Sequence, residues 1–168
     1  NPWMGCTKVS PACDNCYAEN LMDTRYGQVH WGAGQPRRRT GTSTWATPRK
    51  WQRQAEASGQ RPFVFCASLA DVFDNEVDHL WRRDLFALIE ATPNLVWLLL
   101  TKRIGNVERM TSYLPRNVAL GATIANQAEY DRDRIKLFDA GHALGAMFTF
   151  GSFEPLLGPV ILDKYAPD

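Results

Sequence analysis

The sequence predicts an α/β fold of repeated βα units, arranged as a full or partial (β/α) barrel or as a doubly wound sheet. Apolar runs with the length of buried strands recur four times, and segments with apolar residues at helical spacing lie between them. The 168 residues, 45% of them hydrophobic and 22% charged, are typical of one globular domain or of part of a larger one. Because β-α-β crossovers are right-handed and parallel strands need covered faces, these are the architectures that such a series allows.

The irregular segments lie in the first third of the chain. Residues 1–16 are expected to form a Cys-rich loop, because prolines and a glycine interrupt them and no helical or alternating pattern survives. Apolar residues at helical spacing predict a helix from Cys16 to Gly27 and a second helix over 45–57. Residues 27–62 form a basic and aromatic insertion around that second helix. A long insertion of this kind indicates a functional role.

Residues 63–162 carry the βα units. The apolar run at 63–67 predicts a strand buried on both faces. A helix that carries Val77 and Ile89 follows it, and Pro93 ends that helix. The same cycle then repeats, with strands expected at 96–101, 118–123 and 146–150 and helices at 104–113 and 127–139.

Composition excludes several classes of protein. Nineteen Lys and Arg against eighteen Asp and Glu give a formal net charge of +1, which carries no overall signal for nucleic acid or membranes. The longest apolar run, Leu95 to Leu100, has six residues, whereas a membrane-spanning helix requires roughly 20. No secretory signal opens the chain, so we expect a cytoplasmic protein. Because the chain begins without Met, we expect the single α/β domain of residues 1–168 to be a fragment.

Each predicted strand ends in polar residues. In both candidate architectures ligands gather at the carboxyl ends of the strands, so four polar ends together predict a ligand site. Lys102 and the neighbouring Arg103 are equally compatible with solvated residues at the start of a helix. The candidate ligand contacts are Ser68, Asp71, Thr101, Lys102, Thr123, Asn126 and Glu154.

Three of the four cysteines, Cys6, Cys13 and Cys16, lie within eleven residues of the expected loop. Four cysteines are too few for a disulfide scaffold in a chain of this length, so the cluster indicates metal or redox chemistry. Thiolates suit zinc, copper(I) and iron–sulfur clusters. A structural zinc site needs four ligands, and His30, fourteen residues after Cys16, is the nearest candidate for the fourth. A [4Fe-4S] cluster held by three thiolates keeps one iron open to a ligand.

Longer strings around these residues resemble the three-Cys-motif phage protein family over nearly the whole chain. They are residues 1–19 (NPWMGCTKVSPACDNCYAE), 65–73 (FCASLADVF), 98–103 (LLLTKR) and 154–160 (EPLLGPV). That family is regarded as radical-SAM-like and distantly similar to the spore photoproduct lyase group. The resemblance implies a TIM-barrel-like fold of the radical-SAM type in the cytoplasm of a bacterial host.

The resemblance also implies a function. Cys6, Cys13 and Cys16 would bind a [4Fe-4S] cluster, and S-adenosylmethionine would bind the fourth iron. Reductive cleavage of S-adenosylmethionine would then produce a radical that abstracts hydrogen from an unknown substrate, with nucleic acid and nucleotides as candidates. Ser68 and Asp71 would hold the amino group of S-adenosylmethionine, although the Gly-Gly-Glu string usual in that superfamily is missing. The later strand-end residues would contact ribose, carboxylate or substrate.

Cys66 has two interpretations. A thiol near the cofactor would serve as a hydrogen-atom donor, a role suggested for some lyases of that group. Its position inside an expected buried strand favours the alternative, in which the thiol packs as a small hydrophobic side chain.

The insertion is locally basic. Between Arg25 and Arg61 there are eight basic residues and a single acid, Glu56. Interleaved guanidinium groups and aromatic rings are typical of single-stranded nucleic-acid grooves. In the alternative, the tryptophans pack a helix and the arginines pair with acids such as Asp71, Asp74, Asp78 and Glu76. The expected nucleic-acid contacts are Arg37, Arg38, Arg39, Trp45, Arg49, Lys50 and Trp51.

Three hypotheses about function therefore stand side by side. The first is the radical-SAM-like iron–sulfur enzyme. The second is a nucleic-acid-binding module without catalysis, stabilised by zinc on three cysteines and a histidine. The third is a thiol–disulfide protein built on Cys13 and Cys16.

Overall fold

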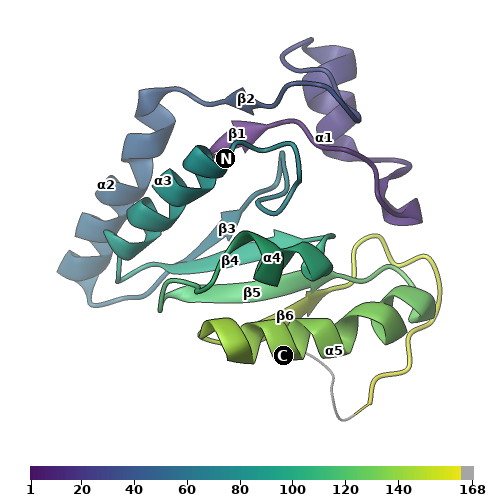
Figure 1. The fold of residues 1–168 in the computed structure, drawn as a ribbon. Helices are drawn as coiled ribbons and strands as arrows, with labels where there is room; N and C mark the ends of the chain where they lie inside the picture. The colour runs from purple at the N-terminus through teal and green to yellow at the C-terminus, as the bar shows by residue number, and fades with distance from the viewer. Residues whose placement is uncertain (164–168) are drawn as a thin grey trace.

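The computed structural model describes residues 1–163; residues 164–168 of the expected domain lie outside the described residues. Figure 1 shows a sheet flanked by helices, with the amino-terminal segments packed above it. The sheet consists of β3 (Phe63–Cys66), β4 (Val96–Thr101), β5 (Val118–Thr123) and β6 (Thr149–Ser152). The α/β class and its series of βα units are therefore confirmed.

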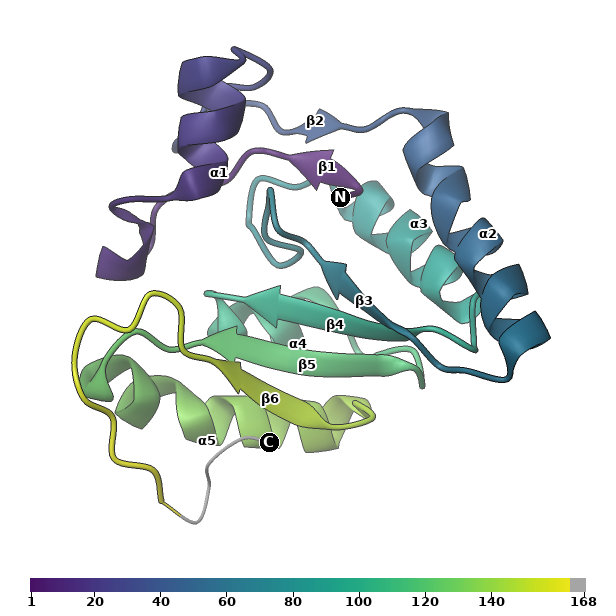
Figure 2. The same ribbon diagram turned by 180° about the vertical axis from the view of Figure 1, so that it is seen from behind.

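The sheet is parallel and wound in one direction. Its strand order is β3-β4-β5-β6, and every neighbouring pair is parallel. The connecting helices are α3 (His79–Glu90), α4 (Val107–Met110) with a preceding 3-10 turn (Ile104–Asn106), and α5 (Gln127–Leu144). Sequential right-handed crossovers place all of them on one face, as Figures 1 and 2 show. A doubly wound sheet has a reversal of strand order, and the described residues show none; they show an open sheet and no closed barrel.

The expected amino-terminal loop contains short regular elements. β1 (Trp3–Met4) pairs antiparallel with β2 (Arg38–Arg39), and Gly5 forms a parallel bridge with Ala70. A helical segment follows the cysteines as α1 (Tyr17–Glu19) and a π-helical continuation (Asn20–Arg25). These pairings tie residues 1–5 both to β2 in the insertion and to the region just beyond the end of β3.

Two helices are longer than predicted. α2 (Thr42–Ser58) begins three residues before the expected Trp45, and Gly59, with a φ of 66°, ends it. α5 continues past the expected residue 139 to Leu144, where Gly145 with a φ of 75° caps it. Gly141 lies inside α5. A Cβ at this position would overlap the side chain of Thr149, so only glycine fits there. Glycine here serves close helix–strand packing.

Two of the predicted βα elements have different bounds. The expected helix at 104–113 is replaced by the 3-10 turn and the single turn of α4, which ends at Met110. The last strand runs over Thr149–Ser152 and not over 146–150. Pairing of Leu120 with Thr149 fixes this register.

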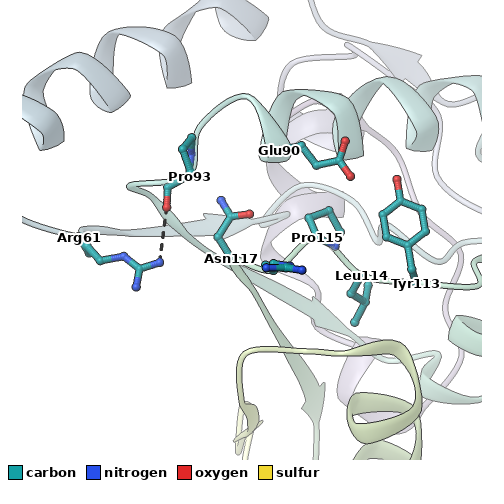
Figure 3. Close-up of a pocket in the computed structure, with 8 residues that line it drawn as sticks. Arg61, Glu90, Pro93, Tyr113, Leu114, Pro115 and Asn117 are labelled. Carbon is teal, nitrogen blue, oxygen red and sulfur yellow. Dashed lines mark hydrogen bonds between the residues drawn. The ribbon is translucent and has the colours of Figure 1, made fainter.

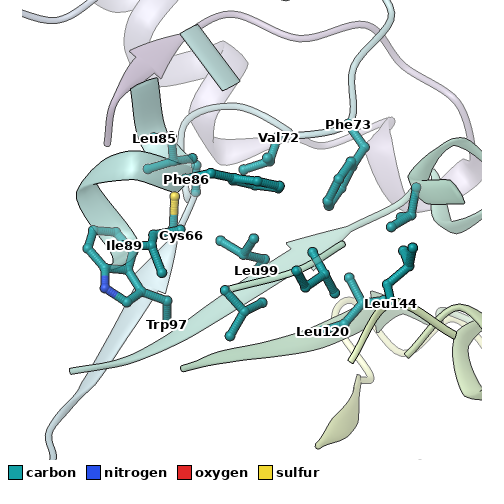
Figure 4. Close-up of a cluster of buried hydrophobic side chains, with 14 of the residues drawn as sticks. Cys66, Val72, Phe73, Leu85, Phe86, Ile89, Trp97, Leu99, Leu120 and Leu144 are labelled. Carbon is teal, nitrogen blue, oxygen red and sulfur yellow. The ribbon is translucent and has the colours of Figure 1, made fainter. Parts of the chain in front are cut away.

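The hydrophobic core lies between the sheet and the helices. Figure 4 shows Cys66, Leu99 and Leu120 from three neighbouring strands in one cluster, with Leu85 and Ile89 of α3 beside Cys66. All five side chains are buried. The indole Nε1 of Trp97, also in this layer, donates to Thr92 Oγ1 at 3.1 Å. Burial at this interface is the main source of stability for a domain of this size.

The opposite face of the sheet has no helix over it in the described chain (Figure 2). Phe63 and Phe65 of β3 point to this face and are 64% and 49% exposed, so the expectation that this strand is buried on both faces is wrong. The rings of Phe63 and Phe148 are 6.4 Å apart, although Phe148 leads into β6 at the other edge. Edge strands of a flat four-stranded sheet stand about 14 Å apart. The sheet therefore curls toward its uncovered face.

Replacing Gly121 with alanine is expected to destabilise the protein by about 1–3 kcal/mol through overpacking. A Cβ on Gly121 would overlap the ring of Phe150, its partner across β5 and β6. Urea denaturation measures the loss. A Gly121→Ala, Phe150→Leu double variant should recover part of the lost stability, and no recovery would contradict the overlap as the cause.

No helix within residues 1–163 combines the length and the apolar character needed to cross a bilayer.

Candidate functional site

A cavity of about 580 Å³ opens at the carboxyl end of the sheet. Its volume lies in the range typical of ligand sites. The three clustered cysteines all line it, although they come from a segment that precedes the sheet. Among the predicted site residues, it is lined by Cys6, Cys13, Cys16, Ser68, Asp71, Thr101, Lys102, Thr123 and Glu154.

Cys6 is held by backbone contacts on both sides. Gly5, whose φ of 102° favours glycine, donates its N–H to the carbonyl of Leu69 at 3.1 Å. The carbonyl of Cys6 accepts from the N–H of Gly32 at 2.9 Å. The loop is thus fastened both to the end of the first parallel strand and to the insertion.

Cys13 and Cys16 belong to a separate turn. Ser10 caps the 3-10 helix Pro11–Cys13 by accepting from the N–H of Ala12 at 3.2 Å. Cys16 is the N-cap residue of α1, and its carbonyl accepts from the N–H of Asn20 at 3.1 Å. All four cysteines of the chain are free thiols in this structure.

Asp71 is the central polar group at the end of β3. Its carboxylate accepts from Thr101 Oγ1 at 2.8 Å, from the N–H of Lys102 at 3.1 Å and from the N–H of Phe73 at 2.9 Å. It also accepts from Arg103 Nη1 at 3.0 Å. Both oxygens are therefore bonded within the protein, and the carboxylate joins the ends of β3 and β4.

Arg103 was not among the predicted site residues, yet it lies at the cavity wall with 7% of its side chain exposed. Its Nη1 lies 3.4 Å from the sulfur of Cys6, and its Nη2 donates to the carbonyl of Thr7 at 2.7 Å. Burial alone would lower the pKa of Arg103, but the negative charges of Asp71 and Asp74 help to raise it overall. The sequence carried one signal for Arg103, because this residue directly follows the polar strand-end residues Thr101 and Lys102.

The Cys6 thiol has a raised pKa. Burial raises the pKa to about 11, although the neighbouring Arg103 opposes this rise. The metal-free thiol is therefore protonated at neutral pH, and binding of a metal group at this sulfur releases a proton.

Two predicted site residues lie away from the cavity. Asn126 is the N-cap residue of α5, where its side chain accepts from the N–H of Glu129 at 3.0 Å. Cys66 is buried against α3 in the core and lines only a separate cavity of about 160 Å³. Burial raises the pKa of this thiol to about 12. The packing interpretation accounts for this placement of Cys66.

The structure divides the basic insertion into buried and exposed arginines. Arg37 is buried and forms ion pairs with Asp74 at 2.7 Å and Glu76 at 3.0 Å, so its guanidinium does not face solvent. Arg39 pairs with Asp84 at 2.9 Å and lies over the ring of Trp45. This pairing follows the alternative in which the arginines bind acids of the same chain.

The remaining predicted nucleic-acid contacts are exposed. Arg38 bonds Gln28, while Arg49, Lys50 and Trp51 lie on the outer surface of α2. At 100° per residue, Trp51 points to a different flank of the helix from Arg49, so these side chains do not alternate along one groove. Nucleic-acid binding through this surface stays a prediction.

A second cavity, of about 560 Å³, lies at the amino end of the sheet. Figure 3 shows Glu90 and Tyr113 turned toward each other there, and Arg61 bonded to the carbonyl of Pro93. None of the predicted site residues lines it. The cysteine cavity is therefore the candidate site.

The types of metal-binding side chain around the cysteine cavity indicate which metal groups it suits. Within residues 1–163 no three His, Cys, Asp or Glu side chains are placed to hold a metal ion. His30 does not line the cavity; its Nδ1 lies 3.3 Å from Asp23. A [4Fe-4S] cluster binds each thiolate at a different iron, so its ligands stand farther apart than those of a single ion. Three thiols around one cavity, without a histidine, fit such a cluster.

A model of the family described as "Protein of unknown function (DUF5131)" matches residues 1–165. No curated protein and no solved structure matches the chain. The family description names no activity, cofactor or substrate.

Proposed function

Because this chain belongs to the DUF5131 family, whose description assigns no function, we propose its activity from its own site: a radical-SAM-like iron–sulfur enzyme. Cys6, Cys13 and Cys16 would hold a [4Fe-4S] cluster, and the rest of the cavity would take S-adenosylmethionine and a substrate. The barrel-like arrangement of this enzyme class is part of the same proposal, since the curled, singly wound sheet is the pattern of a partial (β/α) barrel.

The observation that carries this proposal is that three thiols line one cavity at the carboxyl end of a parallel sheet. The lining offers no histidine and no fourth cysteine as a further soft ligand. Three thiolates leave one iron of a cubane free, and that position is where a substrate or cofactor can bind.

Polar residues of two strand ends are available to a ligand. Lys102 follows β4 and Glu154 follows β6, and neither forms an ion pair with another described residue. A carboxylate and an ammonium group that line the same cavity complement a zwitterionic amino-acid end, such as that of S-adenosylmethionine. Ser68 and Thr123 add hydroxyl groups to the lining.

With the cluster bound, the site would supply reductive cleavage of S-adenosylmethionine. One electron from an external reductant would break a carbon–sulfur bond, and the adenosyl product would take a hydrogen atom from the substrate. The protein binds and orients the reactants and excludes water. Tyr17, Trp31 and Leu157 line the cavity and supply the apolar cover. Nucleic acid and nucleotides stay predictions as the substrate class.

Anaerobic reconstitution with iron and sulfide tests this function. The wild type is expected to hold about four irons per chain, with visible absorption that dithionite bleaches. Cys13→Ala should lose most of this iron, because one of three ligands is gone. Cys66→Ala is the matched control, since its thiol lies in the core, and should keep the full iron content. The reduced wild type should release 5′-deoxyadenosine from S-adenosylmethionine.

Stoichiometric zinc with no reducible chromophore after reconstitution would refute the proposal and leave a zinc-stabilised binding module. Equal iron loss in Cys13→Ala and Cys66→Ala would refute the assignment of the ligands.

A further inference from the structure

One guanidinium group touches both the cysteine loop and the end of the sheet. Arg103 bonds the carboxylate of Asp71 at 3.0 Å, the carbonyl of Thr7 at 2.7 Å and the sulfur of Cys6 at 3.4 Å. It lies two residues after the end of β4, and its backbone N–H donates to Thr101 Oγ1, in the last residue of that strand, at 2.9 Å. Its planar set of donors reaches these acceptors together, which the single ammonium group of a lysine cannot do.

The other two cysteines lack such a contact. Hydrogen bonds at Cys13 and Cys16 involve backbone atoms, and within the described residues no cation donates a hydrogen bond to their sulfurs. Cys6 is therefore the one ligand of the three whose side chain is anchored to the sheet.

A second buried arginine supports the same segment. Arg37 donates from Nη2 to Thr7 Oγ1 at 2.7 Å while it pairs with Asp74. Thr7 is thus bonded through its carbonyl by Arg103 and through its hydroxyl by Arg37. The peptide after Cys6 is held from two sides by two buried cations.

We propose that Arg103 is the positioning residue of this site: it fixes the Cys6–Thr7 segment against the sheet before any metal group binds, and it places a positive charge and an N–H donor at the sulfur of Cys6. The first part concerns the protein alone, and the second rests on the proposed function. A hydrogen bond and a positive charge at a cluster thiolate raise the reduction potential of the cluster.

Arg82 provides a matched control. It is buried like Arg103 and lies among the same acidic residues, where Nε donates to the carbonyl of Val72 at 2.9 Å. It contacts no cysteine. Comparing Arg82→Met with Arg103→Met therefore distinguishes two roles: general stabilisation of this region and positioning of Cys6.

The first measurement is hydrogen exchange in the metal-free protein. In Arg103→Met the amides of residues 4–9 and of Gly32 should exchange about tenfold faster than in wild type, because the local opening free energy of this segment falls. Arg82→Met should leave these amides unchanged relative to the rest of the chain. Arg103→Lys keeps the charge and should show an intermediate rate, which serves as the test should Arg103→Met fail to fold.

The second measurement uses the reconstituted protein. Arg103→Met should bind iron about 10–100-fold more weakly, which is typical of the loss of a group that orients a metal ligand. The remaining cluster should have a more negative midpoint potential, and Arg103→Lys should recover part of that shift.

The outcomes separate this inference from the proposed function. Equal exchange rates in the Arg103→Met and Arg82→Met proteins would overturn the positioning role. An unchanged midpoint potential in Arg103→Met would overturn the role of its charge at Cys6. A wild type that takes up no iron would refute the proposed function, while the exchange comparison would still decide whether Arg103 positions the segment.

Discussion

Replacing Arg37 with alanine is expected to lower the free energy of unfolding by about 3–5 kcal/mol. The side chains of Arg37 and Asp74 are 1% and 3% exposed, and the two groups lie 2.7 Å apart. Removing the guanidinium leaves the carboxylate of Asp74 buried, with the N–H of Glu76 at 3.2 Å and a 3.9 Å contact to Arg103. The cost of a buried charge without its partner is larger than the net contribution of the intact pair. Guanidinium chloride denaturation measures the change.

The neighbouring residue gives the control for this prediction. Arg38 is exposed and donates only to Gln28, so Arg38→Ala should change the stability by no more than about 0.5 kcal/mol. If both substitutions changed the free energy of unfolding by similarly small amounts, the buried pair would be contradicted. Arg37 would then belong to an exposed basic surface, which is one of the two interpretations of the sequence.

Leu99→Ala is expected to destabilise the protein by about 2–5 kcal/mol. Leu99 is fully buried at the centre of β4, between the sheet and α3 (Figure 4). Its truncation removes favourable apolar burial and leaves a cavity that the surrounding strands and helix fill only in part. Thermal or urea denaturation of the two proteins measures the difference.

The next residue along the strand tests the asymmetry of the sheet. Leu98 points to the uncovered face beside Phe65 and is half-buried. Leu98→Ala should therefore cost only about 1 kcal/mol. A cost as large as that of Leu99→Ala would show that something covers this face in solution.

The sequence predicted the order of the helices and strands well, but it predicted less well which of their faces are buried. Strand-length apolar runs and helical periodicity depend on local composition, so β3, β4 and β5 were found within one residue at their ends. The exposure of Phe65 could not be predicted in the same way, because an apolar run looks the same whether a strand is covered on one face or two. Winding direction decides that coverage, and it is a property of the whole sheet.

The candidate site shows the same division. Nine residues that were predicted from the cysteine spacing and the polar strand ends line one cavity in the structure. The sequence left the surroundings of Arg103 and Arg37 open, because a charged residue in a polar stretch is usually solvated. Their burial depends on Asp71 and Asp74, which are more than thirty residues away in sequence from each partner.

The contact between Cys6 and Arg103 spans 97 positions of the chain. Contacts of such long range form late, because the entropy of closing a long loop opposes them until the intervening elements have packed. During synthesis the cysteines leave the ribosome first, and the arginine that anchors one of them follows only after β3, α3 and β4 have been made. We expect the thiols of a nascent chain to stay unanchored through that interval, so that the cysteine loop docks at the end of folding.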